Sequence, residues 1–361
     1  MRIKINGIAI DIERNIFLNT INYKEAREKY FFIDVRSPSE FKEDTIPGAV
    51  NIPLFNDEER NEVGTTYVQI GKTEAKRLGV KLLAPKLPDM FEQVLDLKYK
   101  HNNLAAFCAR GGYRSGFICS SFSSVGIPIY QLEGGYKNYR KEVIESLPLL
   151  NDKVTYIVLS GNTGVGKTDI LYGLKNLGCS ILDLEGAANH RGSIFGSVGL
   201  GECNGQKRFE TNIYDQLMKA NDNYVFVEAE SQKIGKVTIP KYISEKMKNG
   251  IQIFIDSDLE HRIKSLKKDY ILNDDWKVES IRAMEYLNKY ISKDKIEILK
   301  QEIMNDNFDF VAGELMEKYY DPMYGFKSGK LNYAARFNHK TTVEEVCSEI
   351  LMWYNDFKAK P

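Results

Sequence analysis

The sequence predicts two consecutive α/β domains, each built around a parallel β-sheet. The chain has 361 residues, more than a single domain usually holds. Short apolar runs rich in β-branched and aromatic residues alternate with helical patterns, an order typical of parallel sheets. The segment 161–168, GNTGVGKT, fits the phosphate-binding pattern G-x-x-x-x-G-K-[ST] between an apolar run and a helical pattern, which indicates the second sheet.

The composition is that of an ordinary globular protein, with 43% hydrophobic and 28% charged residues. The 50 Lys and Arg residues balance the 50 Asp and Glu residues, so any basic surface for a nucleic acid must be local. The first 15 residues lack the pattern of a signal peptide and no apolar run is long enough to cross a bilayer, so we expect no membrane partner. The cysteines form no CxxC pair and have no zinc spacing, so we expect a cytoplasmic protein without a metal site of that kind: Cys108, Cys119, Cys179, Cys203 and Cys347.

The first domain is expected to begin with a short helix over 20–30 and a buried strand over 31–35, FFIDV. Ser37-Pro38 suits the start of a helix, and 46–49 suits a loop that returns to a strand. The next elements are expected to be helices over 67–80 and 86–98, the strand LAAFC, the helix RSGFICSSFSSVG and the strand PIYQLEGG. This β-α-β-α-β order predicts a parallel sheet with helices on both faces, and it places Cys108 at the carboxyl end of a strand, where such sheets hold their sites.

Cys108 is the best candidate nucleophile of the chain. It lies between the end of a strand and the start of a helix, where backbone N–H groups and the helix dipole favour an anion. Because Arg110 and Arg114 flank it, we expect the thiolate to be favoured over the thiol. The alternative is a buried and inert cysteine, which the two arginines and the paired Gly111 and Gly112 disfavour.

Residues 15–145 resemble the rhodanese (sulfurtransferase) domain. The resemblance rests on D-V-R-x-x-x-E-F at 34–41, T-I-P-G-A-V-N-I-P at 45–53, the Cys108 loop and L-E-G-G at 132–135. It implies that Cys108 carries the transferred group and that the loop backbone cradles it. It also implies that Asp34 and Arg36 buttress the loop.

The loop from Cys108 to Arg114 has five intervening residues, one more than many rhodanese loops that carry only sulfur. Phosphatases and arsenate reductases of related fold share this length. A seven-residue ring closed by an arginine suits a tetrahedral oxyanion, because the backbone forms a nest and the guanidinium a bidentate fork. A thiophosphate or selenophosphate donor, a phosphatase activity and a harmless insertion at 111–112 all stay open at this point.

The second domain follows a short connector at 145–153 and begins with the strand VTYIVLSG. In the P-loop, which we define as residues 161–168, Gly161, Gly164 and Gly166 let backbone N–H groups face a diphosphate or triphosphate. Lys167 supplies positive charge and Thr168 can bind Mg²⁺. The alternative, a plain turn with this pattern by chance, is rare between a strand and a helix.

A strand over 180–184 leads into a polar, glycine-rich segment in which His190 and Arg191 could contact a substrate phosphate or a base edge, or belong to an ordinary surface loop. A helix over 206–221 and a buried strand over 224–235 follow. Glu228 takes the position of a Walker B magnesium carboxylate, with a glutamate held by a helix N-terminus as the alternative. A strand and a helix over 251–266 come next, and the chain up to 313 is mostly helical and charged.

Basic and aromatic residues are mixed over 318–340, KYYDPMYGFKSGKLNYAARFNHK. Lys327, Lys330 and Arg336 are candidate phosphate contacts, and the aromatic rings could stack on bases, which suits single-stranded RNA. The alternative is a core helix with snorkelling lysines.

The whole chain is similar to the tRNA 2-selenouridine synthase family. The resemblance rests, in chain order, on C-A-R-G-G-Y-R-S, G-N-T-G-V-G-K-T, L-D-L-E-G-A-A-N-H-R-G-S-x-F-G, V-F-V-E-A-E-S-x-x-I-G and Y-Y-D-P-M-Y. It implies an α/β protein with a rhodanese-like parallel-sheet domain over 1–148. A P-loop NTPase-like α/β domain with a helical, basic-aromatic C-terminal part would follow over 149–361.

The resemblance further implies a transferase that replaces the sulfur of 2-thiouridine at the tRNA wobble position with selenium from selenophosphate. It also implies geranylation of that sulfur from geranyl diphosphate. The Cys108 loop would hold selenophosphate, with Cys108 accepting or positioning the selenium, and the P-loop would hold geranyl diphosphate. His190, Arg191 and the 318–340 segment would meet tRNA or the prenyl donor. The implied partners are the tRNA anticodon region and an enzyme that produces selenophosphate, while Mg²⁺ and ATP stay open.

Two other functional classes fit the residues. One is a persulfide sulfurtransferase or oxyanion phosphatase fused to a nucleotide or small-molecule kinase. The other is a nucleotide-gated binding module without chemistry at Cys108. The remaining cysteines lack charged neighbours of the kind found around Cys108 and are expected to be structural.

Overall fold

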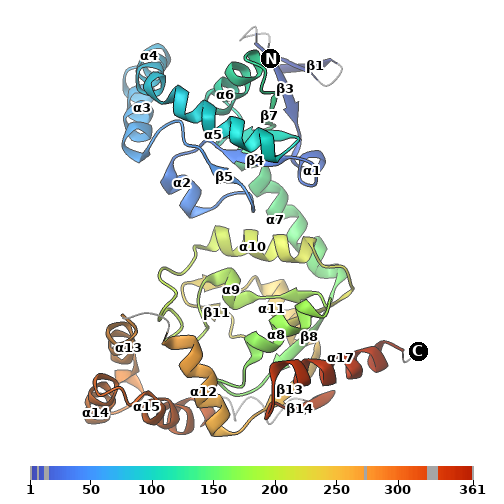
Figure 1. Ribbon diagram of the computed structural model, residues 1–361, viewed down its shortest axis with the longest axis vertical. Helices are drawn as coiled ribbons and strands as arrows, with labels where there is room; N and C mark the ends of the chain where they lie inside the picture. Colours follow the sequence, from blue (N-terminus) through green and yellow to red (C-terminus); the bar gives the residue numbers. More distant parts are fainter. Residues whose placement is uncertain (1, 6–7, 12–15, 272–274, 323–331, 360–361) are drawn as a thin grey trace. The chain divides into compact units, whose positions relative to one another are not determined.

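The computed structural model of the chain describes residues 2–5, 8–11, 16–271, 275–322 and 332–359. The chain divides into two compact units, Met1–Ser146 and Leu147–Pro361. Figure 1 labels their helices and strands. Each unit has its own sheet with a parallel core, as the sequence predicts.

The first unit is built on a seven-stranded sheet in the order β1-β2-β3-β7-β6-β4-β5. Its strands are β1 (Arg2–Ile5), β2 (Ile8–Asp11), β3 (Ile16–Ile21), β4 (Phe31–Asp34), β5 (Val50–Asn51), β6 (Leu104–Phe107) and β7 (Ile129–Leu132). The strands from β3 to β5 in that order run parallel, whereas β1 and β2 add an antiparallel hairpin that the sequence reasoning did not include.

The helix expected over 20–30 is wrong in most of its length. Residues 16–21 form β3, which pairs with β2 on one side and β7 on the other, so its backbone groups are used in the sheet. Only α1 (Tyr23–Ala26) is helical, and the Asn22 side chain caps it by accepting the Glu25 N–H at 3.0 Å.

Helices cover both faces of this sheet, as expected. They are α2 (Pro38–Glu43), α3 (Asp57–Gln69), α4 (Lys72–Leu83), α5 (Leu87–Lys100), α6 (Tyr113–Ser124) and α7 (Gly135–Lys153). The helices α5 and α6 share one core with Ile33 of β4, while the neighbouring Phe32 contacts Tyr23 of α1 on the opposite face. The helix expected over 67–80 is interrupted at Gly71, whose φ of 134° ends α3 and starts α4.

The second unit holds a five-stranded parallel sheet in the order β14-β13-β8-β10-β9. Its strands are β8 (Thr155–Ser160), β9 (Ile181–Leu182), β10 (Tyr224–Glu228), β13 (Ile251–Asp256) and β14 (Ala335–Asn338), with a small separate hairpin of β11 (Lys233–Ile234) and β12 (Val237–Thr238). The helices α8 (Lys167–Asn176) and α17 (Val343–Ala359) pack in one core with Ile157 and Phe226. The helices α10 (Gln206–Met218) and α11 (Lys241–Lys248) contact the sheet at β9 and β8.

The strand expected over 180–184 is shorter than predicted. It ends at Leu182, because Asp183 caps the short helix α9 (Leu184–Ala188) by accepting the Gly186 N–H at 2.7 Å. This early turn brings the residues of α9 to the end of the sheet where β10 also ends.

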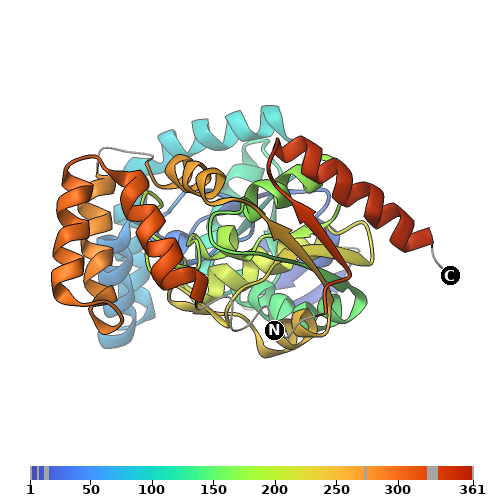
Figure 2. The ribbon, with the colours of Figure 1, turned by 90° about the horizontal axis from the view of Figure 1, so that it is seen from below.

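The expected helical part follows β13 and has an apolar core of its own. It consists of α12 (Leu259–Tyr270), α13 (Trp276–Met284), α14 (Lys293–Met304), α15 (Phe308–Leu315) and a π-helical turn over Met316–Tyr320. Figure 2 shows these helices in orange as a group beside the sheet of the same unit. No helix among the described residues has the length and apolar character needed to span a bilayer.

Candidate functional site

Cys108 directly follows β6, at the carboxyl end of the first sheet. Its Sγ accepts hydrogen bonds from the Gly112 N–H and the Ser115 hydroxyl, both at 3.2 Å. Both donors belong to the start of α6, so the helix N-terminus faces the sulfur as the spacing predicts. Only 3% of the cysteine is exposed, which shields these contacts from water.

The Ser115 hydroxyl is itself oriented by a buried side chain. Gln131 of β7 donates from Nε2 to Ser115 Oγ at 2.8 Å and to the Gly112 carbonyl at 3.0 Å. Since Ser115 Oγ accepts from Gln131, its own proton is directed to Cys108 Sγ. Sequence reasoning missed both residues, because nothing in the local motif marks a glutamine on the neighbouring strand as part of the loop.

The surroundings of Cys108 favour its thiolate. Burial raises the pKa of the thiol, but the Ser115 hydroxyl, the Arg114 charge and the N–H groups of Ser115 and Gly112 outweigh burial and lower the pKa below its usual value. In Cys119, which lies on the same helix about one turn after Ser115, burial and the nearby Cys108 raise the pKa of the thiol instead. The contrast agrees with a nucleophilic Cys108 and a structural Cys119.

The cysteine loop, which we define as residues 108–114, is packed tightly against the turn after β7. Gly111 has a φ of 59°, and a Cβ there would lie 2.9 Å from the Leu132 carbonyl oxygen. The Tyr136 N–H donates to the Cys108 carbonyl at 2.9 Å and the Lys137 N–H to the Ala109 carbonyl at 3.0 Å. Gly111 is therefore part of a closely fitted loop, with no space for a larger residue.

The two arginines of the loop have different surroundings. Arg114 donates to Glu40 Oε2 of α2 at 2.8 Å, whereas Arg110 is exposed. Burial raises the pKa of Glu40, but its bond to Arg114 and the charges of Arg114 and Arg60 lower it below the usual value. The lowered pKa favours the ionised form of Glu40, which holds the Arg114 side chain at the end of the cysteine loop.

Asp34 and Arg36 support the loop without reaching the sulfur. Arg36 forms a buried fork with Asp34, in which Nε donates to Oδ1 at 3.0 Å and Nη2 donates to Oδ2 at 2.6 Å. The Arg36 guanidinium lies 3.9 Å from the centre of the Tyr136 ring. Because the Tyr136 backbone holds the Cys108 carbonyl, the pair fixes the loop through Tyr136.

In the second unit, the P-loop connects β8 to α8, as the motif predicts. Gly164 and Gly166 have positive φ values of 81° and 80°, and Gly161 lies against the Ile255 carbonyl of β13. The Lys167 Nζ lies 3.2 Å from the Gly161 carbonyl oxygen and 3.3 Å from that of Asn162, so the lysine folds over its own loop. This arrangement presents positive charge and helix N-terminal N–H groups to an anion.

Two side chains from distant segments contact backbone carbonyls of the P-loop, and sequence reasoning missed both roles. Arg262 of α12 donates from Nε to the Thr163 carbonyl at 2.8 Å and pairs with both carboxylate oxygens of Asp321. The His339 Nδ1 lies 2.8 Å from the Val165 carbonyl oxygen, just after β14. A histidine or arginine far along the chain carries no sequence signal for such a contact.

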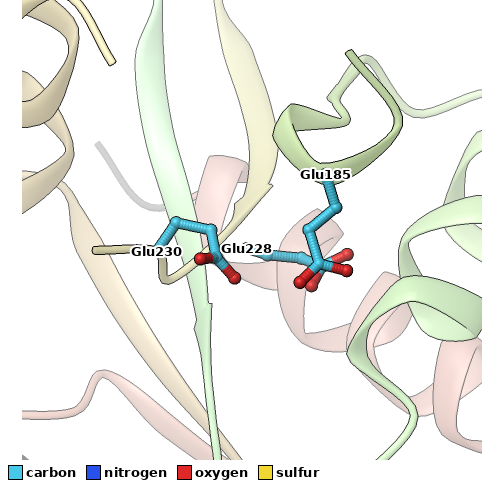
Figure 3. A group of neighbouring side chains, drawn as sticks. All are labelled: Glu185, Glu228 and Glu230. Carbon is cyan, nitrogen blue, oxygen red and sulfur yellow. The ribbon is translucent and has the colours of Figure 1, made fainter. Parts of the chain in front are cut away.

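Three glutamates converge beside the P-loop and form what we call the glutamate cluster: Glu185 of α9, Glu228 at the end of β10 and Glu230 just after it. Figure 3 shows their carboxylates pointing toward one another. One carboxylate oxygen of each lies within 4.8 Å of those of the other two. The sequence reasoning identified Glu228 as a magnesium ligand candidate but gave no role to Glu185 or Glu230.

Burial and mutual repulsion disfavour the ionised forms of the cluster. Burial, followed by the charge of Glu185, raises the pKa of Glu228 to about 8, although the Lys167 charge and a hydrogen bond from Thr168 act the other way. Burial likewise raises the pKa values of Glu185 and Glu230, and each is raised further by a neighbouring glutamate. Perturbed carboxyl groups beside a phosphate loop are typical of a functional site.

His190 and Arg191 lie inside the glycine-rich segment after α9. Gly196 and Gly235 both approach the His190 ring so closely that a Cβ on either would overlap it. Arg191 donates to the Val198 carbonyl at 2.8 Å and lies 5.0 Å from the centre of the Tyr270 ring. Both side chains order their own segment, and their contact with tRNA or a prenyl donor stays a prediction.

The basic-aromatic segment is only partly described. Lys327 and Lys330 lie outside the described residues. Arg336 is exposed on β14, at the edge of the sheet, and its guanidinium lies 4.9 Å from the Phe254 ring centre and 4.8 Å from that of Tyr333. The alternative of a core helix is wrong at this point, because residues 335–338 pair with β13.

An apolar cavity of about 50 Å³ opens beside the P-loop at Thr163. Its walls come mainly from the helical part of the unit, and the lining residues include Leu266, Phe308, Ala312 and Met316 together with the polar Thr163 and Ser193. A Cβ on Gly164 would lie 3.1 Å from the Met316 side chain, so the wall of the cavity touches the phosphate loop itself.

A cysteine loop at the end of one sheet, followed by a P-loop on a second sheet, is the arrangement of a two-domain group-transfer enzyme with two candidate anion sites. Residues 19–142 match the rhodanese-like domain family, and residues 154–354 match the family described as tRNA 2-selenouridine synthase AAA domain. The N-terminal domain of a putative ATP/GTP binding protein from Clostridium difficile 630 is 45% identical, covers 35% of this chain and 98% of its own, and has a TM-score of 0.34.

Curated relatives match most of the chain. The tRNA 2-selenouridine synthase of Nitrosomonas europaea is 30% identical over 81% of this chain and 87% of its own length. That of Hydrogenovibrio crunogenus is 31% identical over 85% of this chain and 92% of its own. The chain belongs to the tRNA 2-selenouridine synthase family, and it is therefore an enzyme of tRNA modification.

Proposed function

We propose that this enzyme converts 2-thiouridine at the wobble position of tRNA into 2-selenouridine, through an S-geranyl intermediate. The observation that carries the proposal is the presence of two anion sites with different surroundings. One surrounds an activated thiol, and the other adjoins an apolar cavity. Each suits one of two phosphate-bearing co-substrates, selenophosphate and geranyl diphosphate.

The P-loop and the adjoining cavity take geranyl diphosphate. Lys167 and the N–H groups at the start of α8 bind the diphosphate, and the geranyl chain enters the cavity beside Thr163. The cavity is narrow, so the chain enters as flexible side chains such as Met284 and Met316 move aside. The thiocarbonyl sulfur then attacks the first carbon of the chain, the diphosphate leaves with the bonding electrons, and the nucleoside loses its N3 proton. ATP is not required in this scheme.

The cysteine loop takes selenophosphate. Arg114 and the N–H groups at the start of α6 bind its phosphate, and Cys108 lies next to the selenium. The selenium attacks C2 of the geranylated nucleoside and geranylthiol leaves. Hydrolysis of the selenium–phosphorus bond then releases phosphate. Selenophosphate comes from a separate enzyme that produces it.

Arg336 is the proposed tRNA contact that is exposed in the described part of the chain. Its guanidinium lies next to the rings of Phe254 and Tyr333, which suit base stacking. Lys327 and Lys330 complete the proposed contact segment. His190 and Arg191 belong to the segment whose Gly192 adjoins Glu185 and Glu230, so we expect them to contact the nucleoside rather than the tRNA backbone.

The test uses the variant Cys108→Ala, with geranylation and selenation of thiolated tRNA measured separately by nucleoside mass spectrometry. We expect selenation to be lost and geranylation to persist, while Cys119→Ala, on the same helix as the loop, retains both. Selenation without geranylation in Cys108→Ala would refute this division of labour. Unchanged 2-selenouridine in tRNA from cells lacking the gene would refute the function altogether.

A further inference from the structure

The glutamate cluster brings three carboxyl groups to the P-loop, although a site for an anionic phosphate needs positive charge. Its three carboxylates lie within 4.8 Å of one another, and Glu228 is only 3% exposed. Lys167 is the positive group whose charge acts on all three. One positive charge leaves the ionised cluster with a net charge of minus two, so the arrangement needs either bound protons or a cation.

One oxygen of the cluster points to a missing ligand. The buried Oε1 of Glu228 has no hydrogen-bond partner in the part of the chain that the structure describes, although buried polar atoms nearly always have one. The Thr168 hydroxyl contacts the same carboxylate. Figure 3 shows the Glu228 carboxylate beside that of Glu185, with the Glu230 carboxylate pointing toward this pair.

The side chain opposite Glu228 is held in place. Glu185 sits on α9, whose start is fixed by Asp183 through the Gly186 N–H at 2.7 Å. Asp183 in turn accepts from the Tyr172 hydroxyl at 2.5 Å, and its own N–H donates to Gln216 at 2.7 Å. Glu185 and Glu228 are therefore presented from a capped helix and a strand, and Glu230 follows that strand by two residues, as suits a preformed ligand site.

We propose that Glu185, Glu228 and Glu230, together with the Thr168 hydroxyl, form a binding site for a hard divalent cation, Mg²⁺ or Mn²⁺. Carboxylate and hydroxyl oxygens are the ligands these ions prefer. A P-loop usually supplies a hydroxyl and one or two carboxylates and relies on the bound phosphates for the rest. With three carboxylates of its own, this site binds the ion before any phosphate compound arrives, and the inference does not depend on which diphosphate follows.

The experiment titrates Mn²⁺ into the metal-free, full-length protein without tRNA or diphosphate, and follows bound ion by electron paramagnetic resonance. We expect one saturable site from which Mg²⁺ displaces Mn²⁺. The variants Glu185→Gln, Glu228→Gln and Glu230→Gln should each weaken Mn²⁺ binding at least about tenfold, because each loses a charged ligand. Glu260→Gln, at an exposed position on α12, is the matched control and should bind like the wild type.

Thermal unfolding separates loss of a ligand from loss of the fold. At one Mn²⁺ concentration, the Tm of the wild type and of Glu260→Gln should rise more than that of Glu228→Gln, because the shift depends on the ion concentration relative to the Kd. Without metal, Glu228→Gln should be at least as stable as the wild type, because a neutral amide of similar shape replaces a buried carboxyl group that burial and Glu185 disfavour in its ionised form. The inference is overturned if Mn²⁺ binds at no saturable site or if the three cluster variants bind it like the control. Because neither co-substrate is present, either result is independent of the proposed selenation.

Discussion

The hydroxyl of Ser115 offers the sharpest test of how the fold activates Cys108. It donates to Cys108 Sγ at 3.2 Å and is completely buried, so Ser115→Ala removes one hydrogen bond and admits no water in its place. A hydrogen bond to a charged group contributes about 1.5–3 kcal/mol. The long distance to a sulfur acceptor favours the lower end, which corresponds to about a tenfold change in an equilibrium.

The sign of the effect follows from the direction of the pKa shift. The contacts around Cys108 lower the pKa of its thiol, so removing one raises it and the thiolate fraction at neutral pH falls. Alkylation by iodoacetamide reports that fraction, because only the thiolate reacts. We expect Cys108 in Ser115→Ala to react about tenfold more slowly near neutral pH. At alkaline pH, where the Cys108 thiol is fully ionised in both the variant and the wild type, the rates should converge.

The assay follows the Cys108 peptide by mass spectrometry over a range of pH. Ser120→Ala is the matched control, because its hydroxyl lies on the same helix but donates only to the Gly116 and Phe117 carbonyls, at 2.9 and 3.1 Å. Equal rates for Ser115→Ala and Ser120→Ala near neutral pH would refute the reasoning. A reduction of the same size at every pH would also refute it, since that pattern indicates altered access to the sulfur.

Three further predictions follow from the contacts. Arg262→Met should lower the free energy of unfolding in urea by about 3 kcal/mol, because its carboxylate partner Asp321 is left unpaired. The control Lys267→Met breaks an exposed ion pair and should lower it by at most about 1 kcal/mol. Equal decreases for the two variants would contradict the role of Arg262 in supporting the P-loop. Ala312→Phe should fill the apolar cavity and raise the KM for geranyl diphosphate at least about tenfold, with inhibition by inorganic diphosphate unchanged. If inhibition by inorganic diphosphate weakens to the same extent, the geranyl group does not bind in this cavity. Arg114→Lys keeps the charge but not the fork, so phosphate should protect Cys108 from iodoacetamide at about tenfold higher concentration than in the wild type, and undiminished protection would remove Arg114 from the anion site.

The two anion-binding loops are predictable from sequence because each is one contiguous segment. In 161–168 and 108–114, the spacing of glycines and charged residues between a strand and a helix determines the local backbone. The expected parallel sheets follow for the same reason, since each strand is a short apolar run. Expectations fail where pairing partners decide the outcome: Thr20 and Ile21, expected at the start of a helix, pair with β7 as the end of β3. The alternative of a core helix fails at 335–338, because these residues pair with β13.

By itself, then, the sequence determines the parallel core of the two sheets, the nucleophile candidate Cys108 and the phosphate loop around Lys167, since all of these depend on neighbours in the chain. Only the tertiary structure decides what surrounds them. Gln131 orients the donor to the sulfur from another strand, and Glu185 meets Glu228 only because β9 and β10 end side by side. Such contacts join residues that lie on different secondary-structure elements, and their chemistry arises from burial and proximity, which no local spacing encodes.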